Sequence, residues 1–280
     1  MEKAIKRYFP IFVLPTMIAF TLGFIIPLVE GVYLSFCKFT TVNDAKFIGF
    51  ANYAKVFADE TFVHAFWYTA AFTVVSVILI NVLAFAVALL LTKGFKGTNI
   101  FRPVFFMPNL IGGIVLGYIW QLLLNGILMN FSRTLTYSST YGFWGLIVLM
   151  CWQQIGYMMI IYIAGIQNIP GELIEAAEID GATKWQILKK VTIPMVMPSI
   201  TVCTFLTLTN SFKLFDQNLA LTNGEPSKMS EMLALNIFYT FYGRTGYEGV
   251  GQAKAVIFFI LVTVIALTQN YLTRRKEVQQ

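Results

Sequence analysis

The chain contains six long, uncharged hydrophobic segments, which are separated by charged stretches. About 20 apolar residues suffice to cross the hydrocarbon core of a bilayer as a helix, in which the backbone hydrogen bonds close internally. We therefore predict an all-α, polytopic membrane protein with about six transmembrane helices. The uncharged run 134–171 is too long for one span, so residues 134–141 are expected to form a loop. The predicted spans are 9–29, 65–92, 103–131, 143–166, 191–212 and 255–273.

Basic residues indicate the orientation of these spans, because cytoplasmic loops carry an excess of Lys and Arg. Twelve of the 20 basic residues fall on one side of the six-span arrangement, so both termini are expected in the cytoplasm. This topology accounts for the net charge of +6, and no basic and aromatic stripe indicates nucleic-acid binding. The twelve are Lys3, Lys6, Arg7, Lys93, Lys96, Arg102, Lys184, Lys189, Lys190, Arg274, Arg275 and Lys276.

The N-terminal apolar stretch resembles a secretory signal, but it is too long, and Glu30 follows it where a signal has small cleavage-site residues. We interpret it as a retained first span with Glu30 near its outer water boundary. Cys37, Cys151 and Cys203 are widely separated, which favours buried thiols over a disulfide framework or a zinc site.

Sequence signatures of catalysis are absent. The chain has no G-x-x-x-x-G-K-[ST] phosphate loop, no H-E-x-x-H pair and no G-x-S-x-G elbow. Its single histidine, His64, has no acid or nucleophile at a telling spacing and is expected to be a solvated imidazole at a membrane border. We therefore expect a non-enzymatic protein with no metal and no bound cofactor. Gly113 and Gly117 form a G-x-x-x-G pair that permits close helix approach.

Residues 168–194, on the cytoplasmic side, are too charged to cross the membrane but have helical features. Asn168 can cap a helix, Pro170 fits an early helical position, and Glu172 and Glu175 lie near the positive end of the helix dipole. Gly181 breaks the run, so two short helices joined at this glycine are predicted. The second helix is expected to present an apolar face made of Trp185, Leu188, Ile187 and Val191. Pro194 and Pro198 follow at the entry to the fifth span.

Here the sequence resembles the EAA loop of ABC importer permeases. Glu175, Ala176 and Ala177 are followed after three residues by Gly181, and nine residues later by Val191, Ile193 and Pro194; Val191 and Ile193 depart conservatively from the usual Ile and Leu. In that family the loop forms a coupling helix seated in a cleft of the cytoplasmic ATPase. The resemblance implies an ATPase-coupling role for Glu175, Ala176, Ala177, Asp180, Gly181, Ala182 and Pro194. The alternative is an ordinary amphipathic helix lying on the membrane surface.

Two further stretches resemble carbohydrate permeases. "SFKLFDQNLALTNGEP" is similar to their F-D-x-x-x-x-L-T-x-G-G-P pattern, with Glu225 in place of the second glycine, and "FRPVFFMPNLIGG" opens the third span. Together they resemble the first of two dissimilar permeases in sugar importers of the maltose, raffinose and glycerol-phosphate kind. Compared with the maltose member, the chain lacks extra N-terminal spans and a large external insertion.

The resemblance also implies a substrate pathway, and polar groups inside a membrane are functional candidates because burying them is costly. Hydrogen bonding between helices explains any one of them equally well. Lys213 and Asp216, three residues apart, could form an ion pair lining the pathway, or lie at the outer water boundary and hold the register between subunits. The candidates are Asn109, Gly113, Gln153, Gln154, Tyr157, Thr207, Asn210, Ser211, Lys213, Leu214 and Asp216.

The combined expectation is a single transmembrane permease domain over 1–280 with the type I ABC importer permease fold. It would sit in a bacterial or archaeal cytoplasmic membrane and transport a di- or oligosaccharide. The resemblance implies four kinds of partner: a second homologous permease, two ATPase subunits that use ATP and Mg, an extracytoplasmic sugar-binding protein, and membrane lipid. The alternatives are a stand-alone secondary transporter, which would require intramembrane ion-coupling carboxylates or broken helices, an importer permease for a solute other than a sugar, and an integral-membrane enzyme.

Overall fold

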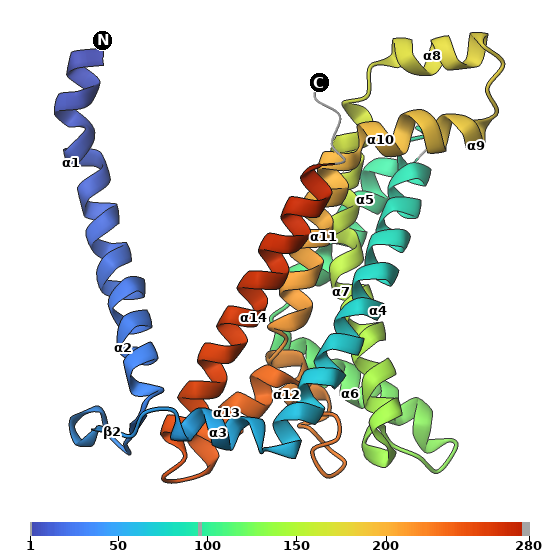
Figure 1. Ribbon diagram of the computed structural model, residues 1–280. Coiled ribbons are helices and arrows are strands. Elements are labelled where there is room, and N and C mark those ends of the chain that lie inside the picture. Colours follow the sequence, from blue (N-terminus) through green and yellow to red (C-terminus); the bar gives the residue numbers. More distant parts are fainter. Residues whose placement is uncertain (1, 95–96, 276–280) are drawn as a thin grey trace. The chain divides into compact units, whose positions relative to one another are not determined.

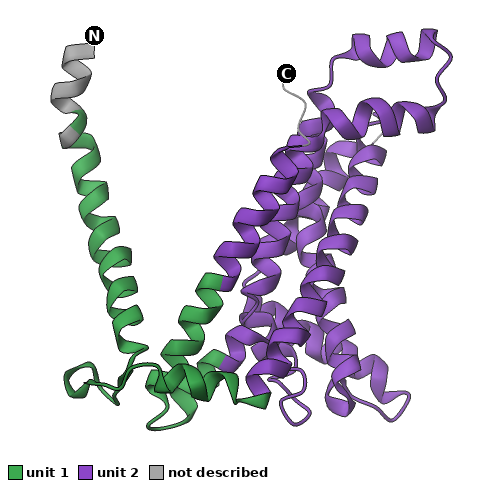
Figure 2. Ribbon diagram, viewed as in Figure 1, with its two compact units in different colours: residues 1–60, 237–260 green, residues 61–236, 261–280 purple. Residues whose placement is uncertain are grey.

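The computed structural model describes residues 2–94 and 97–275. Its elements are helices apart from one two-stranded antiparallel hairpin, in which Cys37 pairs with Phe47 and Lys38 with Lys46. The chain divides into two compact units, which Figure 2 shows in different colours. Unit 1 comprises residues 1–60 and 237–260, and unit 2 comprises residues 61–236 and 261–280.

Unit 1 begins with the first hydrophobic span. Helix α1 (Glu2–Phe20) continues through the π-helical turn Thr21–Ile25 into α2 (Ile26–Leu34). The stretch able to cross a membrane is Ile11–Leu34, so the span continues past Glu30 instead of ending before it as predicted. Pro27 is accommodated at the start of α2, directly after the π-turn, where the regular helical hydrogen-bond pattern is already interrupted.

After this span, unit 1 forms a small cap. Asn52 is buried, and its Nδ2 donates hydrogen bonds to Ser35 O at 2.9 Å and to Cys37 O at 2.8 Å. These bonds fasten the cap to the chain leaving the span. The elements are β1 (Cys37–Lys38), the 3₁₀ turn Val42–Asp44, β2 (Lys46–Phe47), α3 (Ala51–Phe57), most of α13 (Leu233–Gly243) and the first half of α14 (Glu248–Arg274).

A buried ion pair lies in the same unit. The Lys254 side chain on α14 is fully buried, and its Nζ contacts Asp59 Oδ2 at 2.7 Å. The same ammonium donates to Thr240 Oγ1 on α13 at 2.8 Å. One buried charge thus joins the residue between α3 and α4 to two helices near the C-terminus, and the short charge-assisted bonds offset its desolvation.

Unit 2 contains the other spans, and the last of them, α14, is divided between the two units. By length and composition, four helices of the described chain can cross a membrane, and six spans result when two bent helix pairs are each counted as one. Two of the four are α4 (Glu60–Leu91) and α7 (Ser139–Gln167), with 32 and 29 residues. Unit 2 also contains the 3₁₀ turn Leu135–Tyr137 and the short helix α12 (Asp216–Leu221).

The third and fifth spans are bent, where continuous helices were predicted. Helix α5 (Thr98–Phe106) and the 3₁₀ turn Met107–Leu110 meet α6 (Gly113–Met129) at 102°. Pro108 opens this turn and residues 111–112 are extended, so the helical hydrogen-bond pattern is broken there. In the fifth span, Lys184–Met195 meets α11 (Met197–Phe212) at 69°. That segment consists of α9 (Lys184–Ile187), the π-helix Leu188–Thr192 and α10 (Ile193–Met195).

Glycines permit the closest helix contacts in unit 2. A Cβ on Gly156 of α7 would overlap the carbonyl oxygen of Phe105, so the α5 backbone rests directly on α7. A Cβ on Gly113 would lie 2.7 Å from Asp216 Cβ, and one on Gly117 would lie 2.5 Å from Ala220 Cβ. The predicted close approach at the G-x-x-x-G pair is confirmed, and the helix that approaches is α12.

Candidate functional site

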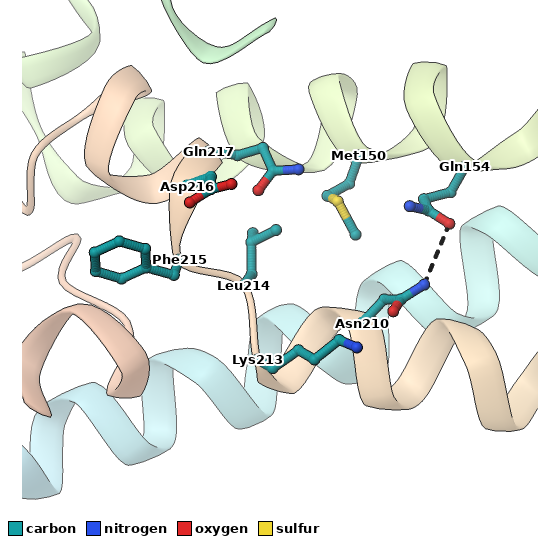
Figure 3. A pocket seen from close by; sticks show the side chains of 8 residues that line it. All are labelled: Met150, Gln154, Asn210, Lys213, Leu214, Phe215, Asp216 and Gln217. Carbon is teal, nitrogen blue, oxygen red and sulfur yellow. Dashed lines mark hydrogen bonds between the residues drawn. The ribbon is translucent and has the colours of Figure 1, made fainter. Parts of the chain in front are cut away.

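A polar cavity of about 260 Å³ lies in unit 2 between α7 and the break that separates α11 from α12. Helix α11 ends at Phe212, and α12 begins at Asp216, so residues 213–215 turn the chain across the cavity. Figure 3 shows the side chains that line it. They are Met150, Gln154, Asn210, Lys213, Leu214, Phe215, Asp216 and Gln217.

Three amide groups and two opposite charges face this cavity. Asn210 Nδ2 lies 3.5 Å from Gln154 Oε1, a long contact that leaves both amides able to bond a ligand (Figure 3). Lys213 supplies three donors and Asp216 supplies acceptors. The lining can therefore donate and accept hydrogen bonds at several points within one small volume, which suits a ligand that carries several hydroxyl groups.

Gln153 does not line the cavity, but it supports the cavity wall through two hydrogen bonds. Its Oε1 accepts a hydrogen bond of 2.9 Å from Gln217 Nε2, and its Nε2 donates to Ile111 O at 3.4 Å. Ile111 lies at the bend of the third span, so Gln153 joins that bend to α12. The Gln153 side chain is only 5% exposed and acts as a positioning residue for Gln217.

Five of the predicted pathway residues line the cavity, and six do not. Gln154, Asn210, Lys213, Leu214 and Asp216 are brought together there. Gly113 instead makes room for α12, and Tyr157 lies beside Phe106, with ring centroids 6.3 Å apart. Asn109 is half-buried in the 3₁₀ turn, and Ser211 is fully buried. The others outside the lining are Gln153 and Thr207.

Lys213 and Asp216 do not share a helix face, contrary to the spacing argument. Helix α11 ends before Lys213, so the i, i+3 relation of a continuous helix does not apply. In the described part of the chain no ion pair joins them. Both nevertheless line the same cavity.

Thr207 belongs to a separate polar network. Asn81 Nδ2 on α4 donates to Thr207 Oγ1 at 2.9 Å, and Tyr162 Oη on α7 donates to Asn81 Oδ1 at 2.6 Å. Thr207 itself donates to Cys203 O at 2.8 Å. Helix-to-helix hydrogen bonding, the alternative reading of the polar residues, therefore applies to Thr207.

Sequence reasoning missed Met150, Phe215 and Gln217 in the cavity and Asn81 in the network. Asn81 could have been found, because an amide in the middle of an apolar span is costly without a partner. Gln217 follows Asp216 directly and is the neighbouring polar residue of α12. Met150 and Phe215 give no signal distinct from that of ordinary membrane-helix residues.

A second candidate site is the loop at the opposite end of unit 2, where α8 (Gly171–Ile179) and α9 lie (Figure 1). The predicted pair of short helices joined at Gly181 is confirmed. The predicted capping is wrong: Asn168 ends α7, and Pro170 precedes α8 without a side-chain cap. The extended backbone conformation of Pro170 separates α7 from α8.

Gly181 closes α8 in a Schellman motif. Its φ is +75°, Ala182 N donates to Ala177 O at 2.9 Å, and Gly181 N donates to Glu178 O at 3.0 Å. Nothing lies within 4 Å of a Cβ built on Gly181. Within this chain, glycine is therefore required by backbone conformation rather than by crowding, and Asp180 occupies the C-cap position.

The chain enters α9 through a capping box. Gln186 N donates to Thr183 Oγ1 at 3.3 Å, and Thr183 N donates to Gln186 Oε1 at 2.7 Å. A Schellman motif followed within two residues by a capping box leaves the turn little freedom. The relative direction of α8 and α9 is therefore locally specified.

The solvent-exposed surface of this loop includes large apolar side chains. Ile179 is 86% exposed and Trp185 is 69% exposed, whereas Ile187 is buried. Trp185 therefore does not share the predicted apolar face with Ile187, because residues two apart on a helix point to different sides of it. Glu175 and Ala176 on α8 are also exposed, Ala177 is half-buried, and Pro194 is the second residue of α10. Such a surface suits a protein partner.

Metal binding has no support in the described residues, which contain no group of three or more His, Cys, Asp or Glu side chains able to hold an ion. The three cysteines are free, and Cys37 and Cys203 are buried. His64 is exposed, with Nε2 3.0 Å from Met229 O.

Comparisons with known proteins agree with this architecture. The sequence matches the family described as "Binding-protein-dependent transport system inner membrane component" over residues 80–278. It is 41% identical to "Probable starch degradation products transport system permease protein AmyD" of Thermoanaerobacterium thermosulfurigenes, over 96% of this chain and 94% of that protein. It is 28% identical to "Multiple sugar-binding transport system permease protein MsmF" of Streptococcus mutans, over 99% of both chains.

The fold also matches a solved structure. A chain of a bacterial ABC transporter involved in the import of the acidic polysaccharide alginate superposes with a TM-score of 0.82, at 23% identity, over 98% of both chains. At this identity the similarity concerns the fold alone.

Proposed function

Because the chain belongs to the family of binding-protein-dependent transport system inner membrane components, we propose that it forms half of the translocation pathway of an importer for di- or oligosaccharides. As a permease of this family it is a non-catalytic, multi-pass inner-membrane protein that works in an ABC importer complex with a binding protein and ATPases. A stand-alone secondary transporter and a membrane enzyme are excluded by this membership.

The polar cavity between α7 and the α11–α12 break is the observation that supports a sugar as substrate. Gln154, Asn210 and Gln217 offer amides that both donate and accept, and sugar hydroxyls do the same. The names of two relatives refer to starch degradation products and to multiple sugars. A sugar therefore fits both the lining and these relatives better than an apolar solute does.

The cavity is smaller than the pockets of about 300–1,000 Å³ that enclose drug-sized ligands. A di- or oligosaccharide therefore needs a further wall. We assign that wall to a second, homologous permease, and we regard residues 1–280 as one transmembrane permease domain in function. In such a pair of permeases, this chain resembles the first.

The α8–α9 loop is the proposed contact with the ATPases. Exposed Ile179 and Trp185 supply apolar area, Glu175 offers a charge-assisted bond, and the fixed turn at Gly181 makes the loop a rigid lever. Two ATPase subunits, which bind ATP and Mg, would close around such loops and turn the pathway outward to receive substrate from the binding protein. Hydrolysis would then reset the pathway.

The proposed topology places both termini and the α8–α9 loop in the cytoplasm of a bacterial or archaeal cell. Lys93, Arg102, Lys184 and the arginines at the end of α14 agree with this orientation. Of the other basic residues used for the prediction, Lys96 and Lys276 lie outside the described residues, as do the side chains of Lys3, Lys6 and Arg7.

The test is uptake of labelled maltooligosaccharides by proteoliposomes that contain the complete complex. Gln154→Leu and Asn210→Leu should each lower uptake about five- to tenfold, because each removes hydrogen bonds worth about 1 kcal/mol. Asn130→Leu, at the exposed end of α6, is the matched control and should transport normally. Normal uptake in both cavity variants would refute the cavity assignment, and transport of another solute class in place of sugars would refute the substrate class.

A further inference from the structure

A cluster of exposed aromatic rings follows the first span in unit 1. Phe47 is 66% exposed and Phe50 is 74% exposed, yet both pack on Phe36, with ring centroids 6.3 Å and 5.2 Å away. Tyr53 packs on Phe36 at 5.1 Å and on Phe50 at 5.8 Å. This aromatic cluster, Phe36, Phe47, Phe50 and Tyr53, is ordered by its own contacts but leaves large apolar faces uncovered.

Two lysines stand beside the cluster in an unfavourable arrangement. Lys38 and Lys46 are directly opposite each other in the β1–β2 ladder, and both are exposed. Like charges at opposed strand positions repel. In the described part of the chain neither lysine forms an ion pair. An external anion would remove this repulsion.

The acidic residue of the hairpin is already engaged elsewhere. Asp44 Oδ1 accepts hydrogen bonds from Thr40 N at 3.0 Å and Thr41 N at 2.9 Å. These bonds lower the pKa of Asp44, so its carboxylate is committed to the turn. Asp44 therefore stays ionised within the turn and, among the described residues, pairs with neither lysine, and the hairpin, with two lysines and one carboxylate, keeps a net positive charge.

The short connection to the first span keeps this hairpin near the membrane surface. Only three residues lead from Leu34, the last residue of the span, to Cys37 at the start of β1, so the hairpin begins at most about 10 Å beyond the helix end. Each polar layer of a bilayer is about 5–8 Å thick. Aromatic rings at such a depth lie at the membrane–water interface, where amphipathic rings are favoured.

The cap cannot fold away from this level. Asn52 ties α3 to Ser35 O and Cys37 O, and Ser35 Oγ lies within hydrogen-bond distance of Tyr53 Oη at 2.7 Å. The aromatic cluster is thus fixed relative to the end of the first span.

We propose that the β1–β2 hairpin is an interfacial anchor that binds the anionic headgroups of the lipid leaflet through Lys38 and Lys46. Phe47 and Phe50 enter the headgroup–acyl boundary beside them. The anchor sets the depth of the first span, and its action does not depend on which solute is transported.

The test uses a tryptophan reporter in the reconstituted complex. Phe47→Trp is placed in a background whose five native tryptophans are replaced by phenylalanine, and fluorescence quenching by brominated phosphatidylglycerol is compared with quenching by brominated phosphatidylcholine. We expect strong quenching by both lipids, with a preference for phosphatidylglycerol of about fivefold for each lysine engaged. The native tryptophans are Trp67, Trp120, Trp144, Trp152 and Trp185.

Lys38→Ser with Lys46→Ser should bring this preference close to one. Lys55→Ser is the control, because Lys55 is exposed on α3 but lies over the Tyr247 ring at 5.8 Å instead of in the hairpin. If the tryptophan-free background does not assemble, the lysine variants are compared in the otherwise native complex by the amount of phosphatidylglycerol that co-purifies.

Three results would overturn the proposal. The first is a reporter that aqueous acrylamide quenches and brominated lipid does not. The second is a preference for phosphatidylglycerol that the double lysine variant leaves unchanged. The third is a reporter that becomes shielded only when the binding protein is added, which would assign the hairpin to an acidic protein surface.

Discussion

Tyr162 Oη donates a hydrogen bond of 2.6 Å to Asn81 Oδ1, and the same amide donates to Thr207, so one asparagine joins α4, α7 and α11. All three residues lie in segments proposed to cross the membrane, where water is not available as an alternative partner. The network therefore joins α7 and α11, which carry Gln154 and Asn210 of the cavity, to each other through α4.

Tyr162→Phe should destabilise the purified protein by about 1 kcal/mol, because hydrogen bonds between membrane helices contribute about 0.6–1.7 kcal/mol each. Asn81→Leu should cost more, since it removes both bonds between helices and leaves the Tyr162 hydroxyl without an acceptor. Thermal unfolding in detergent measures both. Tyr118→Phe, on an exposed tyrosine of α6, is the control and should unfold like the wild type. Equal stability of Tyr162→Phe and wild type would show that the bond contributes nothing.

Gly156→Ala should impair folding more than any cavity substitution does, because the added methyl group would overlap the Phe105 carbonyl. Backbone cannot move aside as a flexible side chain can, so α5 must separate from α7. Gly126→Ala is a matched control in α6, where a Cβ meets nothing within 4 Å. The yield of monodisperse protein after size-exclusion chromatography compares the two, and a normal yield for Gly156→Ala would contradict the tight contact.

Gly181 can be tested with two nearly isosteric substitutions. Asn and Asp both tolerate positive φ, so neither Gly181→Asn nor Gly181→Asp should unfold the turn. Only Gly181→Asp adds a charge beside Asp180, and burying that charge against a partner is costly. We expect Gly181→Asp to lose stimulated ATP hydrolysis in the complex and Gly181→Asn to retain most of it.

The readouts for Gly181 are the amount of ATPase subunit that co-purifies and its hydrolysis rate with sugar-loaded binding protein. If both variants behaved like the wild type, the loop would not be the coupling contact and a surface helix would remain. If both variants failed equally, the space at the contact with the ATPase would limit coupling, and the added charge would not.

Lys254→Met should loosen unit 1, because it leaves Asp59 without its ammonium partner. Breaking a buried pair costs about 3–5 kcal/mol, and we expect about 3 because the Asp59 side chain keeps 19% exposure. The probe is thiol labelling of Cys37, which is fully buried in the same unit. Its labelling rate should rise more than tenfold, while Cys203 in unit 2 labels at the wild-type rate. Adding Asp59→Asn should reverse most of the change, and an unaltered Cys37 rate in Lys254→Met would contradict the prediction.

The length of each uncharged, apolar run identified the spans, because a run this long in lipid must form a helix to satisfy its backbone hydrogen bonds. The bends at 111–112 and near Val196 were not predictable by this criterion, since a run of apolar residues has the same length whether it is straight or bent. Pro108 marks a break in the sequence, but the direct packing of Phe105 on Gly156 next to the 102° bend is a contact between residues distant in the sequence.

The candidate site was only partly predictable for a related reason. Spacing along one helix suggested that Lys213 and Asp216 were neighbours, but the helix ends between Phe212 and Asp216. The cavity arises from that ending, so it includes Phe215 and Gln217, which helical periodicity does not assign to a common face. The turn at Gly181 was more predictable, because its Schellman motif and capping box are encoded within ten residues.

The bend in the third span has a consequence for biogenesis. The two halves, Thr98–Leu110 and Gly113–Met129, are about 20 Å and 26 Å long at 1.5 Å per residue, and neither alone matches a hydrocarbon core of about 30 Å. The carbonyl of Ile111 at the bend receives its hydrogen bond from Gln153, which is synthesised some 40 residues later. The contacts that hold the bend of the third span therefore cannot form until the following span has been synthesised.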